Sequence, residues 1–234
     1  MGKRRREGEP MRGQADQFGR TIEYLRISVT DKCNFRCLYC MPAEGLEWLP
    51  KSEILSYEEI AGIVRELSHE GLTRIRITGG EPTIRPDLDV LFRQLRSIPA
   101  IREIALSTNG LKLQQLAPLL RASGLDRVNI SADSLRPDRI AAISRRTLAF
   151  DPVAAATAAE RAGLTPIKIN VVVMRGINDD EIVDFARLTL SHPWYVRFIE
   201  LMPVGDMRDV TWEHVVPSDE VLERASSLGP LSRT

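Results

Sequence analysis

The amino-acid sequence predicts an α/β protein built as a partial (β/α)6 barrel of the TIM type. Along the 234 residues, short apolar or alternating runs are followed by helical patterns. This order is typical of βαβ units with a parallel sheet. Six such units are too few for a closed eight-stranded barrel, so a partial barrel and an open doubly wound sheet both fit the count. The polar face that recurs along the strands favours the barrel, because strands covered on both sides should be apolar on both faces.

The elements are expected in the following order. Strand patterns occupy residues 24–30, 74–78, 103–107, 127–131, 167–174 and 195–201. Helical patterns occupy residues 56–69, 86–97, 112–122, a long alanine-rich stretch that ends near Gly163, and 179–190. Ser56 and Glu59 have the spacing of a capping box at the start of the first helix. Gly71, Gly124 and Gly163 follow helical patterns as C-terminal stops.

Polar and apolar residues alternate within the predicted strands. Side chains alternate strictly between the two faces of a strand, so Arg26, Arg76 and Lys168 all fall on the polar face of their strands. We expect the apolar face to pack on the helices and the polar face to line a lumen that is wet or filled by a ligand. The alternative, a polar face that meets open solvent, suits an antiparallel sheet and is disfavoured by the intervening helices. In strand 195–201, polar and apolar residues occur on both faces, so the sequence does not show which face looks inward.

Composition indicates an ordinary globular protein of a reducing compartment. Lysine plus arginine equals aspartate plus glutamate, 32 each, so no overall basicity points to nucleic acid. No stretch reaches the roughly 18 apolar residues of a membrane span. Thiols confined to one short segment fit a cytoplasmic location. The basic run at residues 3–6 is expected to lie in a solvated, disordered tail over residues 1–17.

All three cysteines lie within eight residues, as Cys33-x3-Cys37-x2-Cys40 with Tyr39 before the last one. Disulfide pairing cannot satisfy an odd number of thiols, whereas a soft metal site can. Structural zinc prefers four closed ligands, and no histidine stands at the spacing that would supply the fourth, so zinc is the weaker alternative. A four-iron cluster held by three cysteines would leave one iron open to a ligand that is not protein.

The cysteine motif resembles that of the radical S-adenosylmethionine (SAM) enzymes. The resemblance implies that Cys33, Cys37 and Cys40 hold one 4Fe–4S cluster whose open iron binds SAM, and that one electron from the cluster releases a 5′-deoxyadenosyl radical. The segment Gly79-Gly80-Glu81-Pro82 resembles the family segment that contacts the methionine end of SAM. Glycines allow close approach of backbone to a ligand, and a carboxylate can accept a hydrogen bond from an ammonium group. By itself, such a segment is typical of a structural turn.

Further motifs narrow the resemblance to the GTP 3′,8-cyclase family of molybdenum cofactor biosynthesis. They are residues 26–31, 107–110, 129–134, 168–170 and 198–203, and the resemblance covers roughly residues 18–225. It implies contacts to SAM from Tyr39, Gly80, Ser131 and Met202. It implies contacts to GTP from Arg26, Arg76, Ser107 and Lys168, with Ser107 standing where many members have threonine. The implied reaction removes hydrogen from the ribose C3′ of GTP and joins that carbon to guanine C8.

The three cations on the polar face support a phosphate ligand independently of the resemblance. Buried charge is costly without a partner, and arginine suits phosphate through its planar fork. Two acidic residues, Asp133 and Glu81, offer an alternative, because either could neutralise the cations in internal ion pairs.

The family resemblance also implies a C-terminal segment with a second three-cysteine cluster for guanine and an arginine-rich stretch. No cysteine follows Cys40 in this chain. We therefore expect a disordered tail at 1–17, a radical SAM core at 18–202, and a truncated start of the C-terminal segment at 203–234. The alternatives to a GTP cyclase are a cluster- and SAM-binding remnant without GTP turnover and a radical SAM enzyme with another substrate. Expected partners are GTP, an electron donor, and either a second copy or a separate C-terminal portion.

Overall fold

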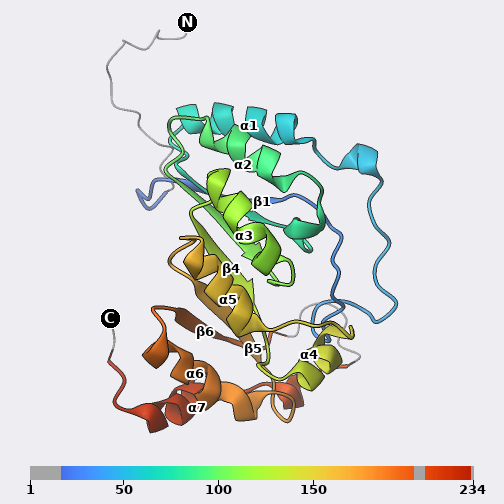
Figure 1. Ribbon diagram of the computed structural model, residues 1–234, viewed down its shortest axis with the longest axis vertical. Coiled ribbons are helices and arrows are strands. Elements are labelled where there is room, and N and C mark those ends of the chain that lie inside the picture. The colour runs from blue at the N-terminus through green and yellow to red at the C-terminus, as the bar shows by residue number, and fades with distance from the viewer. Residues whose placement is uncertain (1–16, 203–208, 233–234) are drawn as a thin grey trace, which may run out of the picture.

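A computed structural model describes residues 17–202 and 209–232 of the chain. Six parallel strands form one sheet in the order β1-β2-β3-β4-β5-β6, so each strand pairs with its neighbours in the sequence (Figure 1). The strands are β1 (Tyr24–Ser28), β2 (Arg74–Thr78), β3 (Glu103–Thr108), β4 (Arg127–Ser131), β5 (Lys168–Val173) and β6 (Tyr195–Glu200). This sequential order is that of a barrel sheet, whereas a doubly wound sheet changes strand order at a switch point.

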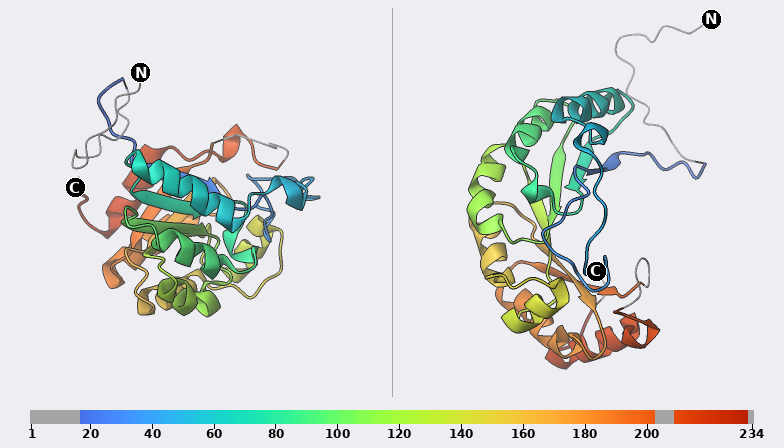
Figure 2. Two further views of the ribbon diagram at one scale, coloured as in Figure 1. Left: turned by 90° about the horizontal axis from the view of Figure 1, so that it is seen from above. Right: turned by 90° about the vertical axis from the view of Figure 1, so that its right-hand side faces the viewer.

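The helices cover the convex side of the curved sheet, and the long connection after β1 runs on its concave side (Figure 2). They are α1 (Tyr57–His69), α2 (Leu88–Arg96), α3 (Leu113–Ala122), α4 (Pro137–Ser144), α5 (Pro152–Arg161), α6 (Ile182–Ser191) and α7 (Ser218–Ala225). Since a doubly wound sheet carries helices on both faces, this arrangement confirms the partial barrel.

The main core lies between the sheet and the helices. Ile75 and Ile77 of β2 are fully buried in it, together with Ile104 and Leu106 of β3. Each such side chain contributes about 1.5–3 kcal/mol of burial free energy. The residues between them in sequence point to the concave side, so the apolar positions predicted from alternation form the helix-covered face.

The predicted helix ends are confirmed where local signals are strong. At the start of α1, Ser56 Oγ accepts a hydrogen bond from Glu59 N at 3.1 Å, and Glu59 Oε2 accepts one from Ser56 N at 2.7 Å. Gly71, Gly124 and Gly163 have φ values of 102°, 106° and 78° after their helices. Residues other than glycine adopt this left-handed region at a cost, so these three positions act as the expected stops.

The alanine-rich stretch does not form one long helix, and this prediction was wrong. It contains two helices, α4 and α5, each beginning with a proline, Pro137 and Pro152. Arg145 ends α4 with a left-handed φ of 51°. Proline is favoured in the first turn of a helix and disfavoured inside one, so Pro152 marks a new start. Helix α7 was not anticipated from the sequence.

The register of β6 shows which of its residues lie on the concave face, a question that the sequence left undecided. Arg197 pairs in register with Asn170 of β5, on the polar side of that strand. Val196 and Phe198 pack against the main core, on the helix-covered face. Arg197 therefore lies on the concave face with the other cations.

Two predicted boundaries fall largely outside the described residues. The tail predicted at 1–17 overlaps the described chain only at residue 17, and the boundary at 203 lies in the undescribed range 203–208. Among the described residues, no helix is both long enough and apolar enough to cross a membrane.

Candidate functional site

The cysteine-bearing loop follows β1 at the carboxyl edge of the sheet. Hydrogen bonds fasten it to the C-terminal end of α4: Arg36 N donates to Ser144 O at 2.8 Å, and Leu38 N donates to Ile143 O at 3.0 Å. Arg145 Nη1 donates to Met41 O at 2.9 Å just beyond the loop. The loop is therefore held through its backbone groups. Its three cysteines form no disulfide bonds.

The three thiols lie close enough to influence one another. Burial raises the pKa of Cys33 and Cys40, and it raises that of Cys37 well above the ordinary value, with Asp133 and the other two thiols adding to the effect. Thiolates in this position need a positive partner, which iron would supply. All three donors are soft, as iron–sulfur clusters require.

The chemistry of the three donors fits the cluster that the motif implied. All three are cysteine sulfurs on one loop, and in an iron–sulfur cluster each thiolate would bind a different iron. Over residues 17–202 and 209–232, no group of three or more side chains is arranged to hold a single metal ion.

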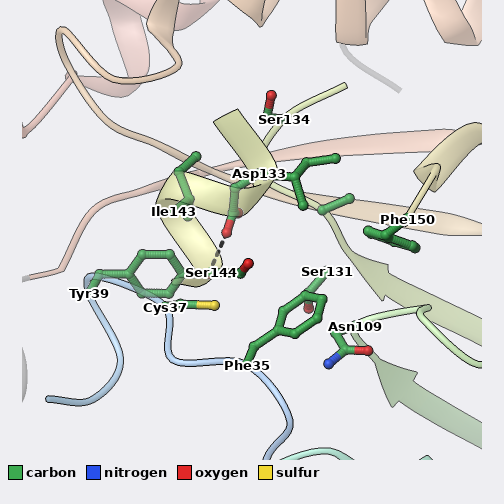
Figure 3. Close-up of a pocket in the computed structure, with 12 residues that line it drawn as sticks. Phe35, Cys37, Tyr39, Asn109, Ser131, Asp133, Ser134, Ile143, Ser144 and Phe150 are labelled. Carbon is green, nitrogen blue, oxygen red and sulfur yellow. Dashed lines mark hydrogen bonds between the residues drawn. The ribbon is translucent and has the colours of Figure 1, made fainter. Parts of the chain in front are cut away.

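Asp133 ties the cysteine loop to the sheet (Figure 3). Tyr39 Oη donates to Asp133 Oδ2 at 2.7 Å, and Val172 N donates to Asp133 Oδ1 at 2.9 Å. Burial raises the pKa of Asp133 to about 6, although both hydrogen bonds act to lower it. The same burial raises the pKa of Tyr39 well above its usual range, so the phenol stays protonated and donates.

A pocket opens beside the cysteine loop, between it and the ends of β3 and β4 (Figure 3). Phe35, Ile140, Ile143 and Phe150 give it an apolar wall. Its polar lining comes from Cys37, Tyr39, Asn109, Ser131, Asp133, Ser134 and Ser144. Two residues predicted to contact SAM, Tyr39 and Ser131, thus lie at the same opening as Cys37, one of the three cysteines predicted to hold the cluster.

Met202 and Gly80 do not line that pocket. Met202 is 65% exposed and precedes the undescribed residues 203–208. Gly80 packs against the start of the cysteine loop, where a Cβ atom would overlap the carbonyl oxygen of Lys32. Gly80 N donates to Thr30 O at 2.7 Å, and Glu81 N donates to Lys32 O at 2.8 Å. The neighbouring backbone by itself is thus enough to require glycine at this position.

The Glu81 carboxylate has a structural role, which corrects the suggestion that it is available to an ammonium group. It is 1% exposed. Glu81 Oε1 accepts from Thr83 N at 3.0 Å and from Thr108 Oγ1 at 2.7 Å, and Oε2 accepts from Asn109 N at 2.6 Å. The carboxylate therefore joins the ends of β2 and β3 and, through Asn109, supports the cysteine loop, because Asn109 Nδ2 donates to Asn34 Oδ1 at 2.7 Å.

The predicted GTP residues lie on the concave face of the sheet. Arg26 and Arg76 are register partners on β1 and β2. Ser107 of β3 pairs with Asn129 of β4, which in turn pairs with Lys168 of β5. Strand pairing thus brings all four predicted residues to one surface.

These cations are close enough to repel one another. The pKa of Lys168 is lowered by burial first and then by Arg197, Arg127 and Arg76. The pKa of Arg76 is lowered by burial first and also by Arg127, Arg26 and Arg197. Sequence reasoning did not assign Arg127 and Arg197 to this group. Arg127 could have been assigned, because it is two residues before Asn129 and therefore lies on the same face of the strand.

The proposed ion pairs with Asp133 and Glu81 do not form, so that alternative was wrong. Both carboxylates are occupied by hydrogen bonds from hydroxyl and backbone groups. Within the described part of the chain, the acidic partner on this face is Glu103, which binds Arg127 at 2.7 Å. Arg26, Arg76, Lys168 and Arg197 have no ion pair there, which leaves a concentration of positive charge facing the concave side.

Comparison with known proteins agrees with this geometry. Residues 27–189 match the model of the radical SAM superfamily. A GTP 3′,8-cyclase of Pelotomaculum thermopropionicum is 48% identical over 217 residues, 92% of this chain and 67% of the relative. One from Moorella thermoacetica is 49% identical over 219 residues, with the same coverage of 92% and 67%. The chain spans about two thirds of the length of these curated relatives.

Solved structures support the fold alone. A radical SAM methyltransferase from Sphaerobacter thermophilus superposes with a TM-score of 0.64 at 19% identity, over 88% of this chain and 62% of that one. Streptococcus suis SuiB bound to S-adenosylmethionine superposes with a TM-score of 0.63 at 16% identity, over 88% of this chain and 47% of that one. The family match over residues 27–189 and the two curated relatives show that the chain belongs to the radical SAM superfamily and, within it, to the GTP 3′,8-cyclase family.

Proposed function

We propose that this chain is a radical SAM GTP 3′,8-cyclase, which converts GTP to its 3′,8-cyclised product and binds GTP on its concave face. The observation that carries the proposal is a group of four cations on the same sheet as the thiol loop that have no ion-pair partner within residues 17–202 and 209–232. They are Arg26, Arg76, Lys168 and Arg197. A triphosphate is the ligand whose charge matches such a surface.

We assign the predicted residues the roles that the family resemblance implies. Cys33, Cys37 and Cys40 hold one 4Fe–4S cluster, while Tyr39, Gly80, Ser131 and Met202 contact SAM. Arg26, Arg76, Ser107 and Lys168 contact GTP. When bound, the cluster and SAM together supply an electron and a radical that abstracts hydrogen. The chain itself binds and orients the nucleotide, and its apolar pocket wall of Phe35, Ile143 and Phe150 limits access of water.

The proposal includes several features of the cellular setting. An electron donor must reduce the cluster, and a reducing, cytoplasmic location keeps the thiols available. The core spans residues 18–202, after a tail at 1–17 and before a further segment from 203. A second copy or a separate C-terminal portion completes the guanine end of the site.

Anaerobic reconstitution with iron and sulfide, followed by SAM, GTP and dithionite, tests the proposal. We expect cluster absorbance, 5′-deoxyadenosine, and a cyclised nucleotide whose formation depends on GTP. Cys37→Ala should abolish cluster absorbance and SAM cleavage together. Glu223→Gln, which changes an exposed side chain on the outer helix α7, serves as the control.

The three readouts separate the competing functions. 5′-Deoxyadenosine without a cyclised nucleotide would contradict the complete cyclase and favour the SAM-binding remnant. GTP that neither binds nor changes 5′-deoxyadenosine formation would favour a radical SAM enzyme with another substrate. Absence of cluster absorbance would contradict all three.

A further inference from the structure

The concave face contains two buried hydrogen-bond donors that nothing in the described chain satisfies. They are Nε of Arg76 and Nδ2 of Asn129. A third unsatisfied buried atom, Oε1 of Gln94, lies on helix α2 on the other side of the sheet. Buried polar groups are nearly always paired, and each one left unpaired costs about 1–3 kcal/mol. Two orphan donors on one surface therefore point to a missing acceptor.

The orientation of the Asn129 carboxamide follows from its neighbour. Arg127 Nη1 donates to Asn129 Oδ1 at 3.2 Å. Because a guanidinium group has donors only, the oxygen of the carboxamide must face it, and the nitrogen must face away. Arg127 is itself held by Glu103 at 2.7 Å. The Glu103–Arg127–Asn129 chain thus fixes the free N–H donor of Asn129.

Asn129 stands at the centre of a row of donors. It pairs in register with Ser107 on one side and Lys168 on the other, and neighbouring strands lie about 4.8 Å apart. Asn129 is 1% exposed, and the longer side chain of Lys168 lies beside it. A hydroxyl, a carboxamide N–H and an ammonium group therefore follow one another across three strands.

The chemistry of the orphan groups selects the ligand class. Both are donors, so the group that satisfies them must accept hydrogen bonds. Phosphate oxygens only accept, whereas a guanine base both donates and accepts. We infer that Asn129 binds the nucleotide directly, by donating its Nδ2–H group to a phosphate oxygen, and that the Glu103–Arg127 pair positions it. The identity of the nucleotide as GTP rests on the function proposed above.

Two substitutions separate this role from a structural one. Asn129→Asp keeps the oxygen that Arg127 contacts, removes the donor, and is expected to fold as the parent does. Asn129→Leu removes the donor without adding charge. Asn170→Asp is the matched charge control, since Asn170 faces the same side one strand away on β5. Thermal unfolding of each variant reports on folding.

Calorimetry on the anaerobically reconstituted protein at low salt measures binding of GTP, inorganic triphosphate and guanosine. We expect both Asn129 variants to bind GTP and triphosphate at least about tenfold more weakly than the parent, with guanosine binding unchanged. Asn170→Asp should weaken triphosphate binding by a smaller factor, because it adds charge without removing the donor.

Three results would overturn the inference. In the first, folded Asn129→Leu binds triphosphate within twofold of the parent. In the second, Asn170→Asp and Asn129→Asp lose the same amount of triphosphate affinity, and Asn129→Leu loses none. In the third, the variants lose affinity for guanosine alone. Failure of the proposed function looks different. In that case the parent still binds triphosphate more tightly than the Asn129 variants do. It does not bind GTP more tightly than inorganic triphosphate, and it forms no cyclised product.

Discussion

Gly80 illustrates how a single residue without a side chain can position the cysteine loop. Its missing Cβ leaves room for the carbonyl oxygen of Lys32, which belongs to the segment that enters the cysteine loop. Glu81 and Asp133 act in the same indirect way, through hydrogen bonds to Asn109 and Tyr39. The sequence motif singles out this segment, but the motif does not distinguish contact with a ligand from support of the loop.

Gly80→Ala is expected to displace the cysteine loop. The new methyl group meets backbone, which cannot rotate away, so the free energy of unfolding should fall by about 1–3 kcal/mol. Iron content and cluster absorbance after reconstitution should fall in parallel. Gly62→Ala is the matched control, because a Cβ at Gly62 in α1 meets no atom within 4 Å and alanine favours a helix by up to about 1 kcal/mol. A Gly80→Ala protein with full iron content would refute the steric argument.

At the scale of elements, α7 and β6 are where sequence reasoning was weakest. Helix α7 is attached to the end of β5 by charge: Arg175 Nη2 donates to Glu220 Oε2 at 2.6 Å, and Arg224 contacts the same carboxylate. Only tertiary contact brings Arg175 and Glu220 together, since 45 residues separate them. The face of β6 was undecided for a similar reason, because apolar and polar residues occupy both parities and only register with β5 distinguishes them.

Glu220→Gln is expected to weaken the attachment of α7 at neutral pH. The hydrogen bond from Arg175, aided by Arg224, lowers the pKa of Glu220 from 4.5 to about 2. Because the folded pKa is the lower one, the carboxylate stabilises the fold above pH 4.5, and this contribution is lost as pH falls from 4.5 towards 2. Urea unfolding across that range should show a shallower acid slope for the variant.

Glu223→Gln provides the control for that measurement. Glu223 lies on the same helix with an exposed side chain and makes no ion pair among the described residues. Its substitution should leave the acid slope unchanged, since no charged partner depends on it. Identical slopes for Glu220→Gln and the parent would show that the pair with Arg175 does not contribute to stability.

The described chain forms a curved sheet whose convex side is covered by helices (Figure 2). Apolar side chains fill the space under the helices, and Arg26, Arg76, Lys168 and Arg197 lie on the concave face. The net charge of zero for the whole sequence does not reveal this concentration of positive charge on one face. Mutual repulsion among Arg26, Arg76, Lys168 and Arg197 raises the free energy of the folded state until an anion binds. Stability should therefore depend on polyphosphate and on salt.

Inorganic triphosphate is expected to raise the melting temperature of the protein at low ionic strength. Binding to the folded state alone stabilises it by mass action, and the effect should fade near 1 M salt, where the screening length drops to about 3 Å. Lys168→Met should raise the basal melting temperature and reduce the triphosphate effect. Arg187→Met removes a cation from the outer helix α6 instead and should preserve the effect. Equal triphosphate effects in the two variants would contradict a concave binding face.

The sequence by itself determined the six strands, the cysteine motif, and the apolar and polar faces of most strands. These are local properties: alternation with period two, helix caps such as Ser56, and cysteines within one loop. Tertiary structure decided the inward face of β6, the pairing of Arg127 with Glu103, and the neighbour that Gly80 accommodates. Each of these depends on which distant segments meet, and strand register and loop packing fix that outcome only when the sheet has formed.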